Sequence, residues 1–449
     1  MPQPHVLFFM CDQLQYQRQG TVDPVAYTPN LDRLAAEGVA FTQHYCANSQ
    51  CVPSRASLQT GRYPHELGVM IIYGFHGHTG RLSGAERTVG QVFREAGYTT
   101  AYFGKTHFGT PLAQLGYDVG SEGAARPPHS AGDRAIVDEA LAFLAGYDPA
   151  QPLFLTVSLH EPHPPFELVE AFADHYPLER LAAPASYWLD DLTTKPPFQR
   201  EHATDKHTYA DEAALLDELR QYYTMISHVD ALFGEVRDAL AAKGMWANTA
   251  AAFTSDHGDM MGAHRLRLKG TLPYDELYRV PLTIRVPAAQ FPRQVVDDLT
   301  VNVSVPGTLL EAAGLALPPA FAGSSLLPAM RRAMPPADEA IYFEHYGAYW
   351  GLHPFRAVRT RRWKYIKHYG PDQTDELYDM IADPLELRSV ADDPALSAIK
   401  AGLERQVDEW WAATGGRDFV YYESPEFKAR GVLPLTSGAA TSRINATSE

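Results

Sequence analysis

The chain has 449 residues, of which 45% are hydrophobic and 20% charged, a composition typical of a globular protein with a large core and room for a smaller second domain. Its formal net charge of −16 argues against nucleic acids and anionic membranes as partners, because both carry negative charge themselves. The cysteines Cys11, Cys46 and Cys51 are too few for a disulfide framework.

The N-terminal residues contain no basic segment, and only the short apolar run at residues 6–10 follows them. We therefore expect no secretory signal peptide. No apolar stretch of the sequence is long enough to span a membrane. Together these observations predict a cytoplasmic protein without a membrane anchor.

Four apolar runs are typical of buried strands, and polar side chains follow each of them. The runs span residues 6–10, 99–103, 153–159 and 250–254. The polar side chains that follow them are Asp12 and Gln13, Lys105 and His107, His160 and His163, and Asp256 and His257. In an open α/β sheet the carboxyl ends of the strands form one edge, where ligands bind. We therefore expect these side chains to share a site at that edge.

Helical patterns lie between the strands. Apolar side chains recur at helical spacing in residues 29–37, 89–96, 132–145 and 211–243. The first two of these segments stop at a glycine, as helices commonly do. The alternation of strands and helices predicts an α/β fold with a large, mostly parallel sheet flanked by helices.

A smaller α+β subdomain is expected after the Pro- and Ala-rich segment 315–336. Three strand-like runs follow at short spacing and predict an antiparallel sheet, at residues 341–345, 356–360 and 363–368. Residues 394–414 predict a terminal helix, and the residues from 437 onward a loose tail. We place the boundary near residue 330, which divides the chain into a catalytic α/β domain at 1–330 and a subdomain at 331–449.

Cys51 occupies an unusual place for a structural thiol. Pro53 suits the first position of a helix and Gly61 would end that helix, so Cys51 would lie at the helix N-terminus. Unpaired amide groups and the helix dipole favour an anion there, and Arg55 adds positive charge one turn later. A buried, inert cysteine is the alternative. An arginine one turn away argues against it, because that charge would be costly in apolar surroundings.

The residues Cys51, Pro53, Ser54 and Arg55 match the C-x-P-S-R signature of the sulfatase family, and the resemblance recurs from there to the C-terminal third of the chain. It implies an alkaline-phosphatase-like fold. It also implies that a formylglycine-generating enzyme oxidises Cys51 to formylglycine, whose hydrated aldehyde is the nucleophile. The segment E-L-Y-D-x-x-x-D-P-x-E at residues 376–386 resembles the C-terminal subdomain of the same family.

Two pairs of side chains, Asp12 with Gln13 and Asp256 with His257, could converge on one divalent cation together with the oxidised Cys51. Oxygen-rich ligation suits Ca²⁺, Mg²⁺ or Mn²⁺, and a single imidazole favours Mn²⁺. The resemblance implies the same site, but Gln13 stands where the family usually has aspartate and His257 where asparagine is common. Fewer carboxylates weaken Ca²⁺ binding, so Ca²⁺ and Mn²⁺ both stay open, and Mg²⁺ is less favoured. The Asp-Gln pair resembles the choline-sulfatase-like and phosphonate monoester hydrolase branches.

A sulfate ester needs positive charge around its oxygens and a proton for its leaving oxygen. Arg55, Lys105 and Lys269 could supply the charge, and His107 and His163 the acid–base function. Motifs of the family imply the same assignment. By this resemblance, a hydroxyl of the hydrated aldehyde attacks sulfur, and Lys269 and His163 protonate the leaving alcohol. His107 then takes the proton of the second hydroxyl, which expels sulfate and regenerates the aldehyde.

The sequence thus predicts a sulfuric ester hydrolase that acts on a small sulfate ester. A phosphonate monoester or phosphodiester hydrolase on the same scaffold is the first alternative, because these esters have similar shape and charge. A non-catalytic metal- or anion-binding protein, in which Cys51 stays a thiol, is the second. The absence of Lys/Arg runs favours a compact, uncharged or aromatic alcohol over a long polyanionic glycan. Assembly as a homo-oligomer stays open.

Overall fold

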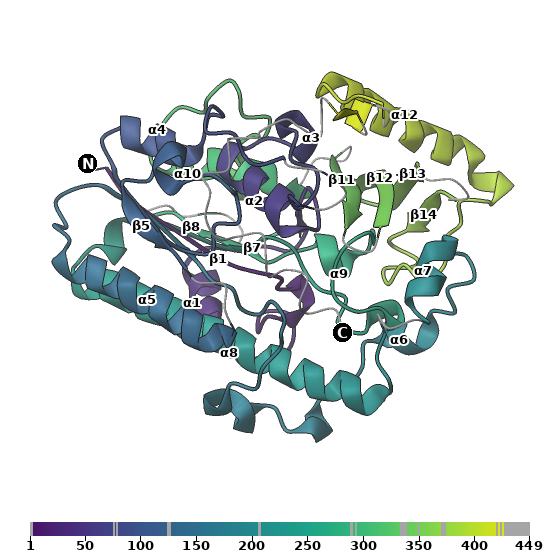
Figure 1. Cartoon of the computed structure of the whole chain (residues 1–449), viewed down its shortest axis with the longest axis horizontal. Coiled ribbons are helices and arrows are strands. Elements are labelled where there is room, and N and C mark those ends of the chain that lie inside the picture. The colour runs from purple at the N-terminus through teal and green to yellow at the C-terminus, as the bar shows by residue number, and fades with distance from the viewer. Residues whose placement is uncertain are drawn as a thin grey trace.

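The computed structural model describes residues 3–425 except 75–76, 78–79, 124–126, 205–207, 288–290, 292–293, 333–338, 349–350, 370–373, 419–420 and 423. In this part of the chain the largest sheet has eight strands in the order β5-β4-β6-β1-β7-β8-β2-β9 (Figure 1). The strands are β1 His5–Cys11, β2 Val39–Phe41, β4 Thr99–Gly104, β5 Val119–Glu122, β6 Leu153–Ser158, β7 Thr249–Ser255, β8 Leu282–Arg285 and β9 Val295–Val296. The short strands β3 His44–Tyr45 and β10 Thr300–Val301 pair separately.

The sheet is mostly parallel, as predicted. The strands β5, β4, β6, β1 and β7 run parallel to one another, and β8 runs antiparallel to both β7 and β2. Every residue of β1 is buried, because helices cover both faces of the sheet. Leu7 and Phe9 point to one layer of helices, whereas Val6, Phe8 and Met10 point to the other.

Helices α1 Pro29–Glu37, α5 His129–Gly146 and α8 Glu212–Ala242 form one layer, drawn below the sheet in Figure 1. Helices α2 Cys51–Thr60, α4 Val89–Glu95 and α10 Val305–Ala312 lie on the opposite face, with α11 Leu327–Arg331 beside them. The remaining α-helices of the described chain are α3 Pro64–Leu67, α6 Ala185–Leu189, α7 Pro197–His202, α9 Asp275–Tyr278 and α12 Ser397–Ala413. None of the helices in the described part combines the length and apolar character needed to cross a bilayer.

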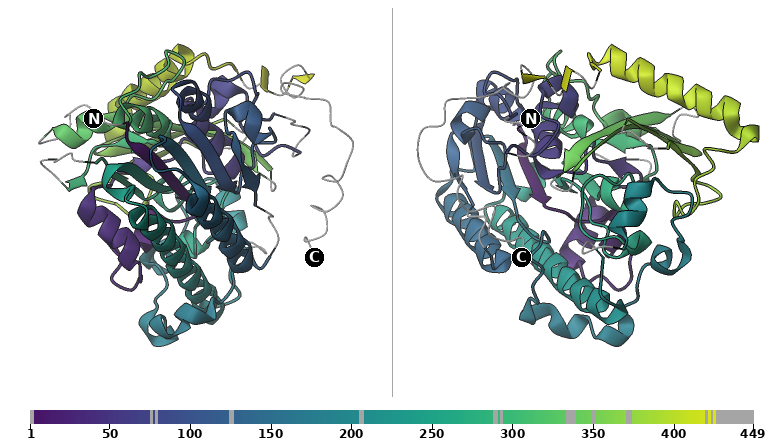
Figure 2. Two further views of the ribbon diagram at one scale, coloured as in Figure 1. Left: turned by 90° about the vertical axis from the view of Figure 1, so that its left-hand side faces the viewer. Right: turned by 45° about the vertical axis from the view of Figure 1, so that its right-hand side comes forward.

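The C-terminal antiparallel sheet is also confirmed. Its order is β11-β12-β13-β14, with β11 Ala340–Ala348, β12 Gly351–Thr360, β13 Trp363–His368 and β14 Glu376–Asp379. Helix α12 packs on its outer face through Leu403 and Val407 (Figure 2, right). The inner face carries Phe343 and Phe355, which pack against Tyr278 at the end of α9. The division at residue 330 stays a prediction, and the tail from residue 437 lies outside the described residues.

The helix that carries Cys51 differs from the prediction in one respect. It begins at Cys51 itself, so Pro53 is its third residue rather than its first. Proline is tolerated there because the first turn of a helix leaves its amide groups unpaired. Gly61 ends the helix with φ of 63°, in the left-handed conformation that favours glycine.

Candidate metal and anion site

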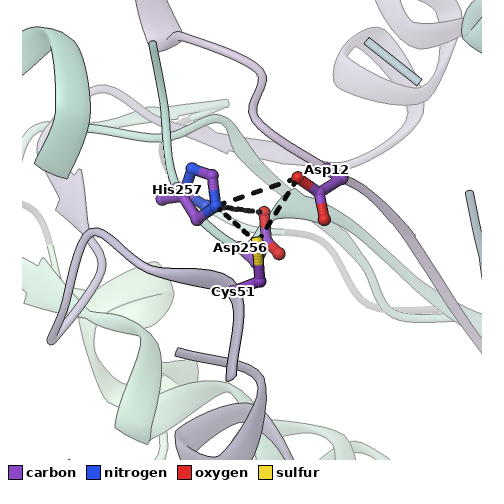
Figure 3. A group of neighbouring side chains, drawn as sticks. All are labelled: Asp12, Cys51, Asp256 and His257. Atoms are coloured by element: carbon purple, nitrogen blue, oxygen red, sulfur yellow. Dashed lines mark hydrogen bonds and ion pairs between the residues drawn. The ribbon is translucent and has the colours of Figure 1, made fainter. Parts of the chain in front are cut away.

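The site begins where the two central strands end. Cys11 of β1 pairs with Ser255 of β7 in parallel register, so the next residues, Asp12 and Asp256, leave the sheet side by side. His257 follows Asp256, and α2 brings Cys51 to the same point (Figure 3). One donor atom from each of Asp12, Cys51, Asp256 and His257 lies within 4.8 Å of all the others. All four side chains are buried. The predicted convergence of these four residues is therefore present in the structure.

Arg55 holds the two carboxylates of this cluster together. Its Nη2 lies 3.1 Å from Oδ2 of Asp12, and its Nε lies 2.7 Å from Oδ2 of Asp256. Its Nη1 donates to the carbonyl oxygen of Lys105 at 2.9 Å and to Oγ of Ser158 at 2.8 Å. The side chain is fully buried, and a buried charge is tolerated only with partners of this kind. Arg55 thus orients the carboxylates, and direct contact with an anionic substrate stays a prediction.

The sulfur of Cys51 lies among cationic and imidazole groups. Its Sγ is 2.9 Å from Nζ of Lys269, 3.3 Å from Nε2 of His257 and 3.9 Å from Nζ of Lys105. Burial and Asp12 raise the pKa of the thiol, but Lys105, Lys269 and His257 together hold that pKa well below its ordinary value. The position of Cys51 therefore favours negative charge, as a site for an anionic substrate requires.

Asp12 is strongly paired. Nζ of Lys105 contacts Oδ2 of Asp12, and Nζ of Lys269 lies 3.9 Å from Oδ1. Burial would raise the pKa of Asp12, yet Lys105 and Lys269 keep it well below the ordinary value, so Asp12 is ionised. An ionised carboxylate at the centre of the cluster is what a divalent cation needs.

The remaining donors fit a divalent cation with mostly oxygen ligands. His257 Nδ1 lies 2.9 Å from the carbonyl oxygen of Gly258; donation there leaves Nε2 free to bind a metal. Gln13 stands beside the cluster, because its backbone N donates to Oδ1 of Asp256 at 3.1 Å. Its side-chain Oε1 is buried and has no hydrogen-bond partner in the described chain. An orphaned amide oxygen and two carboxylates suit Ca²⁺ or Mn²⁺.

The structure places His163 beside the cluster as well. Burial, Lys269 and Lys105 lower its pKa to about 3, although Asp12 and a hydrogen bond with Cys51 act in the opposite direction. Its Nδ1 lies 2.6 Å from the carbonyl oxygen of Pro164, so donation from Nδ1 leaves Nε2 as the free nitrogen. His163 is therefore positioned for proton exchange at the site.

His107 is placed differently. Its ring packs edge-on against Tyr73, with the ring centroids 5.7 Å apart. In the described part of the chain, its buried Nδ1 has no hydrogen-bond partner, and the hydrogen bonds of the Cys51 sulfur do not include His107. The predicted role of His107 stays a prediction.

Three further residues support the site and were not assigned a role from the sequence. Ser158 accepts from Arg55, Asp133 of α5 holds the segment that carries His163, and Asp259 accepts from the amide of Gln13. Ser158 and Asp259 belong to predicted strand-end segments, so their position in the sequence indicated that they could lie near the site. Asp133 lies in the first turns of a helix far along the chain from His163, and its role required the three-dimensional structure.

Comparisons with known proteins find relatives over most of the chain. Residues 4–315 match the family described as sulfatase, and residues 262–413 match the C-terminal region of N-sulphoglucosamine sulphohydrolase. An uncharacterised sulfatase of Escherichia coli K12 is 29% identical, with 90% of this chain and 86% of that protein covered. A choline-sulfatase of Rhizobium meliloti is 28% identical, with 87% and 83% covered.

Solved structures share the fold over nearly the whole chain. A 2-O GAG sulfatase has a TM-score of 0.81 and 26% identity, and the match covers 95% of this chain and 96% of that one. A phosphonate monoester hydrolase of Agrobacterium radiobacter has a TM-score of 0.78 with 92% and 96% covered. At 22% identity, this second match speaks for the fold alone.

Proposed function

The chain belongs to the sulfatase family of sulfuric ester hydrolases, and we propose that it cleaves a small sulfate monoester with a formylglycine derived from Cys51 and one divalent cation. The observation that carries this proposal is the meeting of Cys51 with Asp12, Asp256 and His257 beside Lys105 and Lys269. Carboxylates and an imidazole suit the cation, and the two ammonium groups suit the sulfate oxygens.

Each residue has a proposed role in the reaction. Asp12, Gln13, Asp256 and His257 would hold the cation, which draws electron density from the sulfate oxygens and from the nucleophile when bound. Lys105 and Lys269 would bind the sulfate oxygens as the bond between sulfur and the leaving oxygen breaks. The ammonium of Lys269 would supply the proton of the leaving oxygen, and the free Nε2 of His163 would take up that proton and pass it on. His107 would accept the proton of the second hydroxyl on formylglycine, as the family resemblance implies.

Oxidation of Cys51 to formylglycine would have to precede folding. Only 1% of the Cys51 surface is exposed, and the helix that it begins is buried on all sides. A formylglycine-generating enzyme could therefore reach this residue only in an unfolded or partly folded chain.

The mass of the tryptic peptide that contains residues 49–55, measured on protein produced with and without a formylglycine-generating enzyme, tests the proposed nucleophile. Formylglycine is lighter than cysteine, and we expect hydrolysis of an aryl sulfate to rise with the fraction of the lighter peptide. Chelation should abolish that hydrolysis, and Mn²⁺ or Ca²⁺ should restore it. Equal activity in samples with and without the lighter peptide would contradict the proposal.

The same sample can decide between ester classes. The Asp12-Gln13 pair resembles the phosphonate monoester hydrolase branch, which keeps that activity as a second candidate. Comparing kcat/KM for a phenyl sulfate, a phenyl phosphonate monoester and choline sulfate addresses this question. We expect a sulfate ester to be preferred, and a phosphonate preference above a hundredfold would reverse the order of the two candidates.

A further inference from the structure

We propose that Asp259 is a positioning residue that holds the side-chain amide of Gln13 with its oxygen, rather than its nitrogen, toward the cation of the Asp12–His257 cluster. The inference rests on the proposed function for the presence of that cation. It concerns a residue outside the ligand set, and it explains how an uncharged amide can serve where a carboxylate is common.

An amide ligand faces a choice that a carboxylate does not. The two ends of the glutamine amide are nearly equal in shape, but the oxygen accepts and the nitrogen donates two hydrogens. Only the oxygen can bind a cation, and the NH₂ end would repel it. A buried Gln13 therefore needs a neighbour that distinguishes its two ends.

Asp259 is such a neighbour. Nε2 of Gln13 donates to Oδ2 of Asp259 at 2.5 Å, whereas Oε1 of Gln13 is buried without a partner in the described part of the chain. A flipped amide would place its oxygen against the Asp259 carboxylate, where two acceptors meet without a hydrogen between them. The nitrogen end is thus committed to Asp259, and the oxygen end is the one left for the cation.

Both partners of this contact are anchored. The other carboxylate oxygen of Asp259, Oδ1, accepts from the backbone N of Met261 at 2.8 Å, and Gln15 Nε2 donates to the Asp259 carbonyl. The carbonyl oxygen of Gln13 accepts from the hydroxyl of Tyr222 at 2.6 Å. Gln13 has a φ of 73°, in the left-handed region that residues other than glycine rarely adopt. The amide therefore meets the carboxylate in a fixed geometry.

The same contact has a consequence for residue choice at position 13. A carboxylate there would face Asp259 at hydrogen-bond distance, and two buried carboxylates in contact repel each other. We therefore expect Gln13→Glu to bind a cation more weakly than its extra negative charge would suggest. Asp259→Asn should relieve that repulsion, because the asparagine amide can donate to the new carboxylate.

The experiment is a double-mutant cycle on metal affinity. Mature full-length protein is stripped with a chelator and titrated calorimetrically with Mn²⁺ and with Ca²⁺, for the parent, Asp259→Asn, Gln13→Glu and the double variant. Asp259→Asn should weaken binding by roughly tenfold, the usual effect of losing a residue that orients a metal ligand. In the Gln13→Glu background the same substitution should strengthen binding by roughly tenfold.

The change of sign separates positioning from a general structural role. If Asp259 only supported the fold, Asp259→Asn would weaken binding in both backgrounds, and that result would overturn the inference. An unchanged affinity for Asp259→Asn in the Gln13 protein would overturn it too. A parent protein that binds neither cation would overturn the proposed cation site along with it. Thermal unfolding of the four metal-free proteins identifies any variant that has lost its fold, and Asp259→Ser then replaces Asp259→Asn.

Discussion

Arg55 forms an ion pair with Asp256, with 2.7 Å between Nε and Oδ2, and the same guanidinium reaches Asp12 at 3.1 Å. One arginine from α2 therefore connects the ends of the two central strands. Burial and Asp12 raise the pKa of Asp256 above its ordinary value, although His257 and Arg55 oppose this shift. Without the guanidinium, the two buried carboxylates would repel each other in the metal-free protein.

This arrangement predicts that Arg55→Lys is not a conservative change. Lysine keeps the charge, but it cannot reach both carboxylates and the Lys105 carbonyl oxygen together. Breaking such a buried network costs roughly 3–5 kcal/mol. We expect kcat/KM for an aryl sulfate to fall at least about a hundredfold, measured at saturating metal. The control is Arg33→Lys, at an exposed pair with Glu37, which should leave kcat/KM within about twofold of the parent. A kcat/KM for Arg55→Lys within about twofold of the parent would contradict the role of Arg55 in orienting the two carboxylates.

Cys51→Ala should remove the nucleophile and leave the fold. We expect hydrolysis of an aryl sulfate to drop by more than about a thousandfold, because both the attacking oxygen and the covalent route are lost. Mn²⁺ affinity should fall far less, since Asp12, Asp256 and His257 remain. Cys46→Ala is a matched control, because Cys46 is also a buried free cysteine and lies only five residues upstream. Activity of Cys51→Ala within tenfold of the parent would remove Cys51 from the mechanism.

Much of this site was predictable because its residues follow strands. Runs of buried apolar residues predicted β1 and β7, and the parallel register of these strands places Asp12 and Asp256 side by side. Cys51 and Arg55 were identified from a local motif at a helix start. The sequence did not indicate that the Arg55 guanidinium also contacts Asp12 and Asp256, because a fully buried guanidinium pairs with the nearest carboxylates. Such a contact depends on tertiary distances that spacing along the chain does not contain.

The C-terminal sheet contains a buried histidine that should make the protein sensitive to acid. His345 has 1% of its surface exposed, and both of its ring nitrogens lack partners in the described chain. Burial, with His353 and His368 nearby, lowers its pKa from 6.5 to about 3. The folded state therefore binds fewer protons than the unfolded state between these pH values. The stability that His345 contributes is complete above about pH 6.5 and is lost as the pH falls toward 3.

His345→Phe tests this linkage. Phenylalanine can keep the stacked contact with Phe355, whose ring centroid lies 5.5 Å from that of His345, and it has no proton to bind. Because the pKa of His345 is lowered in this way, the free energy of unfolding falls by about 1.4 kcal/mol for each pH unit between 6.5 and about 3. We expect the thermal unfolding midpoint of the variant to exceed that of the parent by roughly 2–4 °C more at pH 5 than at pH 7.5. His175→Phe, at an exposed histidine, serves as the control. Parallel pH profiles for parent and His345→Phe would contradict the linkage.

Asp133 holds the segment that presents His163, so a change at Asp133 should act through His163. Its carboxylate accepts from the backbone N of His160 at 2.9 Å, from the backbone N of Glu161 at 2.8 Å, and contacts Nδ1 of His160 at 3.0 Å. Asp133→Asn removes one acceptor oxygen and places an NH₂ group near backbone donors, so the segment should shift. If His163 protonates the leaving oxygen, its displacement matters most for alcohols that leave poorly.

We therefore expect Asp133→Asn to lower kcat/KM for an alkyl sulfate by roughly a hundredfold or more, but for a nitrophenyl sulfate by less than about tenfold, because nitrophenolate leaves without a proton. Asp138→Asn is the matched control on the same helix, where Asp138 pairs with Arg134 at the surface. A loss of stability alone would lower both rates by the same factor. Equal losses on the two substrates would thus assign Asp133 to the fold, and unequal losses would tie it to proton transfer by His163.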